Sequence, residues 1–178
     1  MTTLSDINPL QYPIGKFAPP ATYTADQMRG WITDIKELPA KVRAAITGLT
    51  DEQLDTPYRP GGWTLRQVVH HLADSHMNSL IRFKWTMTED SPTIKAYHED
   101  RWAKLADYQL PVEPSLQMLE GIHVRLVALF ESFTEADWER HFVHPETGNN
   151  VQLKRNLALY SWHSRHHLGH ITNTIATF

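Results

Sequence analysis

The sequence predicts an all-α fold, a four-helix bundle with one long crossover connection. Apolar residues recur with a helical period in four stretches, which cover about residues 25–49, 65–88, 115–133 and 154–176. Proline-containing segments separate these stretches, and the longest of them, residues 89–114, is too long for a tight turn. Four main helices with one long connection are typical of a bundle.

The N-terminal quarter is expected to contain an extended arm and a helix. Residues 1–23 contain four prolines and are expected to form the arm. Thr24, with Gln27 three residues later, is a capping-box pattern, so a helix should begin here. Pro39 is expected to kink or interrupt this helix, and a short helix is expected after Thr50.

The middle of the chain contains the next two predicted helices. A second capping box, Thr64 with Gln67, predicts a long helix from about residue 65 to residue 88. Residues 89–114 are expected to form an irregular or partly helical crossover. Ser115 is then expected to cap a helix whose apolar positions continue to Phe133.

The C-terminal third is expected to contain a short helix, a β-hairpin and a last long helix. Thr134 should start a short helix that ends near Trp138. Residues 141–153, with a Gly/Asn turn, are expected to form a small β-hairpin. The last helix should cover about residues 154–176. Residues 1–178 are therefore expected to form a single domain.

The composition excludes several classes of protein. The 17 Lys and Arg residues are outnumbered by 20 Asp and Glu residues and are spread along the chain, so a nucleic-acid partner is not expected. The absence of cysteine excludes a disulfide framework and a thiolate metal site. The N-terminus does not resemble a signal peptide, and no apolar run approaches the ~18 residues that cross a bilayer, so no membrane partner and a cytoplasmic location are expected.

Four of the eleven histidines lie within residues 163–170, which suggests a metal site. At ~100° per residue, His163 and His167 lie closest to the apolar face of the last helix, His170 follows, and His166 lies furthest out. The alternative is a set of histidines that are partly exposed or hydrogen-bonded in the core. Because four imidazoles share one arc, a metal site is favoured. His170 rises about 10 Å along the helix from His163, so it is expected outside the ligand shell.

The third ligand is open from the sequence pattern alone. On the helix over residues 65–88, periodicity alone would select His76, which lies near the centre of the apolar stripe and could instead be a core histidine. His70 and His71 lie on its two flanks, so periodicity does not select His71. Asp74 and Asp107 could serve as a base or support a ligand, but a solvated surface role is favoured for both.

Several segments carry a family resemblance that extends over nearly the whole chain, among them Gly61-Gly62-Trp63-Thr64, His70-His71-Leu72-Ala73-Asp74 and Trp162-His163-Ser164. With these segments the chain resembles the DinB-like superfamily of metal-binding four-helix bundles, and within it the YfiT-type metal-dependent hydrolases. The resemblance implies that His71, His163 and His167 bind one divalent metal ion per chain, with Zn²⁺ favoured over Ni²⁺. It also implies a homodimer.

The resemblance leaves three functions to be distinguished. The first is a metal-dependent hydrolase that activates water on a small-molecule substrate. The second is a metal-dependent S-transferase that uses a low-molecular-weight thiol such as bacillithiol, as relatives in the superfamily do. Because the chain has no cysteine, such a thiol would have to come from outside it. The third is a metal-binding bundle without catalysis. No catalytic residue beyond the metal ligands is assigned from the sequence.

Overall fold

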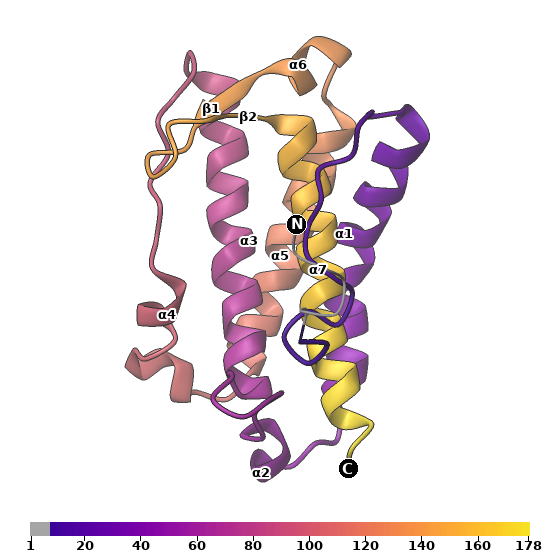
Figure 1. Cartoon of the computed structure of the whole chain (residues 1–178), viewed down its shortest axis with the longest axis vertical. Helices are drawn as coiled ribbons and strands as arrows, with labels where there is room; N and C mark the ends of the chain where they lie inside the picture. Colours follow the sequence, from indigo (N-terminus) through magenta and orange to yellow (C-terminus); the bar gives the residue numbers. More distant parts are fainter. Residues whose placement is uncertain (1–7) are drawn as a thin grey trace.

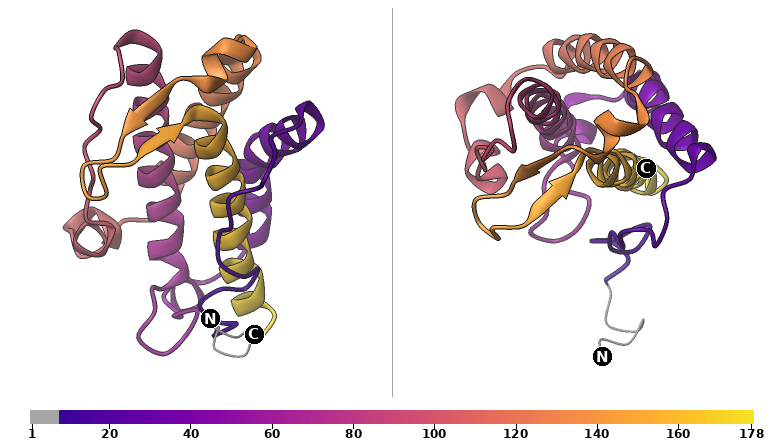
Figure 2. Two further views of the ribbon diagram at one scale, coloured as in Figure 1. Left: turned by 45° about the horizontal axis from the view of Figure 1, so that its top comes forward. Right: turned by 90° about the horizontal axis from the view of Figure 1, so that it is seen from above.

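The computed structural model describes residues 8–178 and confirms the predicted all-α bundle. Its four long helices are α1 (Ala25–Ile46), α3 (Leu65–Thr88), α5 (Glu113–Glu131) and α7 (Leu153–Ile175) (Figure 1). Helices α1 and α3 each pack against both α5 and α7, so α1 and α3 occupy opposite corners of the bundle (Figure 2). Of the predicted arm, residues 1–7 lie outside the described part of the chain.

The predicted crossover sets the directions of the helices. Between α3 and α5 the chain returns along the outside of α3, through the short helix α4 (Glu99–Trp102) and the 3₁₀ turn η2 (Ala106–Gln109) (Figure 1). Helices α3 and α5 therefore run in the same direction, and α7 runs antiparallel to α3. This antiparallel pair brings the two histidine-rich segments of the sequence together.

Short elements cover the two ends of the bundle. Helix α2 (Asp51–Leu54) lies at one end, and helix α6 (Glu135–Glu139) lies at the other. The predicted hairpin is present beside α6, formed by the antiparallel strands β1 (His141–Val143) and β2 (Asn150–Gln152). Its turn contains Gly148, whose positive φ of 67° is a conformation that glycine adopts without strain.

The predicted caps are largely confirmed. Four helices begin with a threonine whose side chain accepts from a backbone N–H three residues later, namely Thr24, Thr50, Thr64 and Thr134. The prediction for Ser115 was wrong, because α5 begins at Glu113 with Pro114 in its first turn. The Ser115 side chain instead lies 2.7 Å from Nδ1 of His70.

The expected interruption at Pro39 is also not observed, because α1 continues through it to Ile46. A proline inside a helix removes one backbone donor and its ring pushes against the carbonyl group four residues earlier. In α1 that carbonyl belongs to Ile35, and it accepts instead from the imidazole of His123 on α5.

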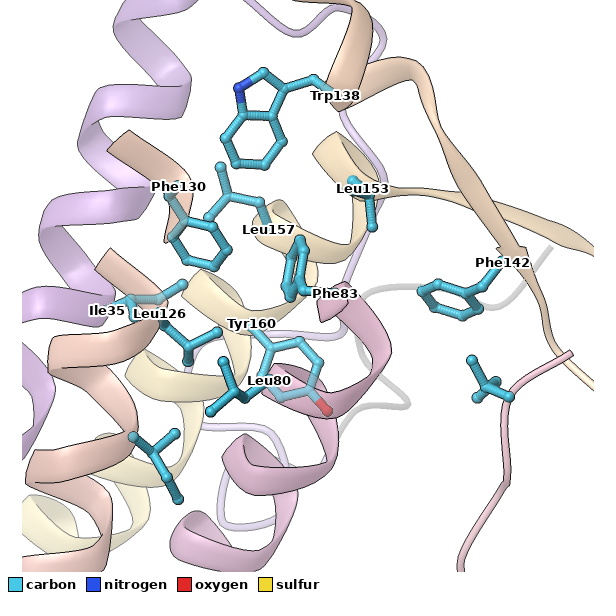
Figure 3. Packing of buried hydrophobic residues seen from close by; sticks show 12 residues of the cluster. Ile35, Leu80, Phe83, Leu126, Phe130, Trp138, Phe142, Leu153, Leu157 and Tyr160 are labelled. Atoms are coloured by element: carbon cyan, nitrogen blue, oxygen red, sulfur yellow. The ribbon is translucent and has the colours of Figure 1, made fainter. Parts of the chain in front are cut away.

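The apolar core consists of two clusters. One lies toward the hairpin end and is rich in aromatic rings, with Phe83, Phe130, Trp138 and Tyr160 among its members (Figure 3). The other lies toward the α2 end and is mostly aliphatic, as at Leu72. Between the two, the long helices α3, α5 and α7 contribute a buried polar layer, which consists of Ser75, His76, Ser79, His123, Ser161, Ser164, His166, His167 and His170.

The described helices include none long and apolar enough to cross a membrane. The bundle instead buries its apolar stripes internally, as the amphipathic pattern predicts.

Replacement of Leu157 by Ala should destabilise the bundle by about 2–5 kcal/mol, because this fully buried side chain lies in the aromatic cluster and its loss leaves a cavity. Val124 on α5 is 72% exposed, so Val124→Ala is the matched control and should change the free energy of unfolding by less than about 0.5 kcal/mol. Urea denaturation measures both. Equal midpoints for the two variants would contradict the assignment of Leu157 to the core.

Candidate metal centre

Helices α3 and α7 meet in a fixed antiparallel register. The Tyr160 hydroxyl donates to the backbone oxygen of Ser75 at 3.1 Å, and Asn156 donates to the Ser79 hydroxyl at 3.5 Å. A step of four residues forward on α3, from Ser75 to Ser79, thus matches a step of four residues backward on α7, from Tyr160 to Asn156. One further turn places His71 opposite the segment of α7 between His163 and His167.

The three histidines that the resemblance selects are brought together by this register. Nε2 of His71 lies 3.1 Å from Nε2 of His163. The His167 ring lies 4.8 Å from that of His71 and 4.5 Å from that of His163, centroid to centroid. One donor nitrogen from each residue lies within 4.8 Å of the other two. Two ligands from one helix and one from another could therefore hold a single ion.

A cavity of about 400 Å³ opens onto these imidazoles. His71, His163 and His167 lie in its wall, with Ser75 and Tyr160 between them. The loop before α3 contributes Trp63, and α7 contributes Trp162 and His166. The rest of the wall consists of Arg82 from α3, of Ala96, Tyr97 and Glu99 from the crossover, and of His144 and Glu146 from the hairpin turn. A small molecule could thus reach the imidazoles from one side.

Burial keeps the three imidazoles neutral. Desolvation, together with the smaller effect of the neighbouring imidazoles of His166 and His170, lowers the pKa of His71 to about 3. The same causes, burial first and adjacent imidazoles second, hold the pKa values of His163 and His167 well below 6.5. Neutral imidazole is the form that binds metal, so the site is ready for a cation at neutral pH.

Two of the three rings, those of His163 and His167, have a further histidine within hydrogen-bond distance of their Nδ1 atoms. Nδ1 of His163 lies 3.3 Å from Nε2 of His76, whose own Nδ1 lies 2.9 Å from Nε2 of His123. Nδ1 of His167 lies 3.3 Å from Nδ1 of His170. The Nε2 atom of His170 donates to the backbone oxygen of Gln11, 3.1 Å away. Such outer partners orient metal-ligating imidazoles.

His71 differs, because its Nδ1 atom is buried without a hydrogen-bond partner in the described chain. Its ring packs against Trp63, with ring centroids 4.7 Å apart. Other cavity residues also have such atoms, namely Nε of Arg82, Nδ1 of His144 and Nδ1 of His166. Buried polar atoms are normally paired, so their concentration around one cavity fits a site that binds a polar ligand.

The loop before α3 places Trp63 on His71 and Tyr58 on His170. The Tyr58 ring stacks on His170 with centroids 3.9 Å apart. Gly61 has a positive φ of 69°, and a Cβ on Gly62 would lie 2.7 Å from Cγ of Arg59, so the tight turn needs both glycines. The buried guanidinium of Arg66 anchors the start of this region through 2.7 Å ion pairs to Asp51 and Asp55.

The N-terminal arm covers the outer side of the histidine cluster, running along α7 (Figure 1). The Tyr12 ring lies 6.0 Å from that of His166, and the Trp162 indole donates to the backbone oxygen of Gly15 at 3.2 Å. The predicted order of burial was therefore wrong. His166, expected to be outermost, is buried, and His163 is the most accessible of the four because it faces the cavity.

A second cluster of donor nitrogens consists of His166, His167 and His170. It shares His167 with the first, so the two sites would compete for that ring. Both nitrogens of His170 already have partners within the chain, at His167 and Gln11. The second cluster also borders a cavity, of about 350 Å³. The cluster of His71, His163 and His167 lies wholly in the wall of the 400 Å³ cavity, and Nδ1 of His71 has no partner in the described chain, which favours this cluster as the metal site.

The two aspartates considered in the sequence do not line the cavity. Asp74 accepts a 2.7 Å hydrogen bond from the Tyr108 hydroxyl, and Asp107 is exposed on η2. The cavity carboxylates are instead Glu99 and Glu146, which sequence reasoning missed because they come from the crossover and the hairpin turn. His123 was also missed, although a polar residue on the apolar face of α5 was a usable signal.

The comparisons with known proteins agree with this architecture. The family model described as "DinB superfamily" matches residues 34–171. The chain belongs to the DinB superfamily. A solved structure of YfiT from Bacillus subtilis, described as "a probable metal-dependent hydrolase with an unusual four-helix bundle topology", is 46% identical with a TM-score of 0.92. The match covers 96% of this chain and 98% of that one.

Close relatives in sequence share the same description. A protein from Geobacillus thermodenitrificans is 52% identical over 169 residues, which cover 94% of this chain and 95% of the relative. A protein from Bacillus mycoides is 53% identical over 164 residues, which cover 92% and 94% of the two chains. Both are named "putative metal-dependent hydrolase".

Single replacement of His71, His163 or His167 by Ala should reduce bound Zn²⁺ well below one ion per chain, because a three-imidazole site loses a third of its donors. His166→Ala is the matched control on α7 and should retain the metal. Elemental analysis after dialysis measures the content. Loss of metal in His166→Ala and His170→Ala, with full retention in His71→Ala, would place the ion on the second cluster instead.

The metal-free protein should lose stability as the pH falls from about 6.5 toward 4. In the unfolded chain histidine takes up a proton near pH 6.5, whereas burial in the folded state lowers the pKa of His123 to about 4 and that of His71 to about 3. Between these values the unfolded state binds more protons, so acid favours unfolding, and the stability is fully present above pH 6.5.

Urea midpoints at pH 8, 6.5, 5 and 4, recorded with a chelator, measure this dependence. His123→Gln removes one of the buried groups, so its midpoint should fall less steeply with pH. A midpoint of the parent protein that is constant from pH 8 to pH 4 would contradict the burial of neutral imidazoles.

Proposed function

We propose that the chain is a metal-dependent hydrolase in which His71, His163 and His167 hold one divalent ion, with Zn²⁺ the first choice. The observation that carries this proposal is the convergence of three neutral imidazoles on one wall of a cavity. An all-imidazole donor set suits Zn²⁺ and also Ni²⁺. Three protein ligands leave a coordination position for water or substrate.

When bound, the ion would supply Lewis-acid activation of a water molecule and of the bond to be hydrolysed. The protein would supply the rest of the chemistry. The two carboxylates in the cavity wall, Glu99 and Glu146, are the candidates for the general base, because no carboxylate on α3 or α7 lines the cavity among the described residues. Both lie outside the helix pair that carries the imidazoles, Glu99 on the crossover and Glu146 in the hairpin turn.

Arg82 would orient the substrate. Its side chain lines the cavity, and its Nε atom has no hydrogen-bond partner within the described chain, while Nη2 lies 3.5 Å from the backbone oxygen of Lys95. A guanidinium with a free N–H edge binds carboxylate or phosphate oxygens well. The proposed substrates are therefore small molecules that carry an anionic or strongly polar oxygen group beside the hydrolysable bond.

The Zn²⁺-loaded protein should hydrolyse members of a panel of small esters, amides and phosphoesters, and a chelator should abolish turnover. His71→Ala should lose the activity with the metal, whereas His141→Ala, on the hairpin outside the cavity lining, should retain it. Activity that survives both the chelator and His71→Ala would contradict metal-dependent hydrolysis.

The same panel, repeated with a low-molecular-weight thiol, separates the hydrolase from the S-transferase considered for the sequence. The hydrolase forms product without added thiol. Turnover of the esters or amides that occurs only with the thiol, and that yields a thioester with release of the alcohol or amine, would assign the site to S-transfer. A metal-loaded protein inactive under both conditions would favour the bundle without catalysis.

A replacement of Arg82 tests the orienting role. Arg82→Met keeps the length and the apolar stem of the side chain but removes the N–H donors, so KM for anionic substrates should rise about 10-fold or more while metal content stays unchanged. Steady-state kinetics and elemental analysis measure the two effects. An equal change in KM for uncharged substrates would contradict anion binding by Arg82.

A further inference from the structure

We propose that a proline in α1 fixes the proton position of the metal ligand His163, through a relay of two buried positioning residues, His76 and His123. This inference rests on the proposed metal site. It concerns His76, His123 and Pro39, none of which lines the cavity.

The relay begins at a backbone oxygen. Ile35 on α1 would normally accept from the N–H of residue 39, but that residue is proline and has no N–H. The proline ring also pushes against the carbonyl group four residues earlier, which is that of Ile35. In the structure the oxygen of Ile35 instead pairs with Nδ1 of His123 on α5. The proline thus gives this imidazole a free acceptor in the core.

A carbonyl oxygen only accepts a hydrogen bond, so its partner must donate. This requirement determines which nitrogen carries the proton, first in His123, then in His76 and then in His163. His123 carries its proton on Nδ1, which leaves Nε2 as an acceptor. His76 lies 2.9 Å away through its own Nδ1, so it must donate there and keep Nε2 as an acceptor. His163 lies 3.3 Å from that Nε2 through Nδ1, so it too must carry its proton on Nδ1.

The consequence for the site is direct. With the proton on Nδ1, the lone pair of His163 lies on Nε2, the atom that faces His71 at 3.1 Å. This is the tautomer that binding of a cation at Nε2 requires. In the opposite tautomer Nε2–H would point at the metal position.

Burial makes the relay specific. His76 and His123 are at most 2% exposed, so no solvent competes for their nitrogens. Their rings stack with centroids 4.7 Å apart, and burial lowers the pKa of His123 to about 4, so the relay is neutral near pH 7. The facing groups from the packed helices are the imidazole of His163, the hydroxyphenyl ring of Tyr160 and the Ile35 carbonyl. The charged side chains of Lys36, Arg43, Glu120 and Glu131 line a pocket that also borders His123. A neutral relay has one consistent proton arrangement.

The first experiment measures the tautomers in the metal-free protein. Long-range ¹H–¹⁵N correlation of the imidazoles at pH 8 should show His163, His76 and His123 all protonated on Nδ1, although free histidine favours Nε2–H. Protonation of His76 or His123 on Nε2 would overturn the proposal. This readout needs no metal, so it can succeed or fail independently of the proposed function.

The second experiment measures Zn²⁺ affinity by competition with a chromophoric chelator. His76→Leu removes the acceptor for Nδ1 of His163 and should weaken binding about 10- to 100-fold. His76→Gln can present an amide oxygen near the position of Nε2 and should restore most of the affinity. Equal affinities for parent and His76→Leu, or equal losses in the two variants, would overturn the role of His76 as an acceptor.

The third experiment uses Pro39→Ala, which separates the relay from general damage to the fold. Alanine is favourable inside a helix, so this variant should unfold at a higher urea concentration than the parent. It also returns an N–H to the Ile35 carbonyl, so the Nδ1–H signal of His123 should weaken and Zn²⁺ affinity should fall several-fold. Ala44→Ser, also in α1, is the control and should leave the tautomers unchanged. A Pro39→Ala variant with the parent's tautomers and affinity would overturn the link to α1.

Discussion

Burial of neutral imidazoles in the middle of the bundle is the constraint on which the rest of the structure depends. Each buried nitrogen needs a partner, since an unpaired polar atom in a dry core costs about 1–3 kcal/mol. For His76, His123 and His170 the bundle meets this need with other imidazoles and with backbone oxygens at Ile35 and Gln11, whereas Nδ1 of His71 and of His166 has no partner in the described chain. The apolar core is consequently divided into two clusters, with the polar layer between them.

The two proposed metal ligands on α7, His163 and His167, are held in comparable ways. His163 begins a series of hydrogen bonds that runs through His76 and His123 to a backbone carbonyl of α1. His167 begins a shorter series that runs through His170 to a backbone carbonyl of the N-terminal arm. Each series ends on a group that only accepts, so each can define the proton positions behind it. Rigid ligands reduce the reorganisation that accompanies metal binding, which is how the outer residues contribute to affinity. The arm and α1 therefore support the proposed metal site, although neither supplies one of its proposed ligands.

Membership of the DinB superfamily and the name shared by the relatives agree with this geometry, but the chemistry depends on the cavity. The imidazoles in its wall come from α3 and α7, whereas its carboxylates come from the crossover and the hairpin turn. This division is common in enzymes, because a fixed scaffold holds the metal and connecting segments adapt to the substrate. Glu99 and Glu146 lie on these connecting segments, and Arg82 on α3 is the one residue of the helix pair that is proposed to contact the substrate.

The sequence by itself determined the four long helices, the capping threonines of α1, α2, α3 and α6, and the hairpin, because periodicity and capping act over a few residues. Only the tertiary structure decided the details of the site. Periodicity could not select His71, since its place opposite His163 and His167 follows from the register of α3 against α7. A helical wheel could not foresee the burial of His166, since a distant arm covers it. Pro39 was expected to disturb α1. In the structure the Ile35 carbonyl, which Pro39 leaves without its helical donor, pairs with His123 on α5, and these residues are far apart in the sequence.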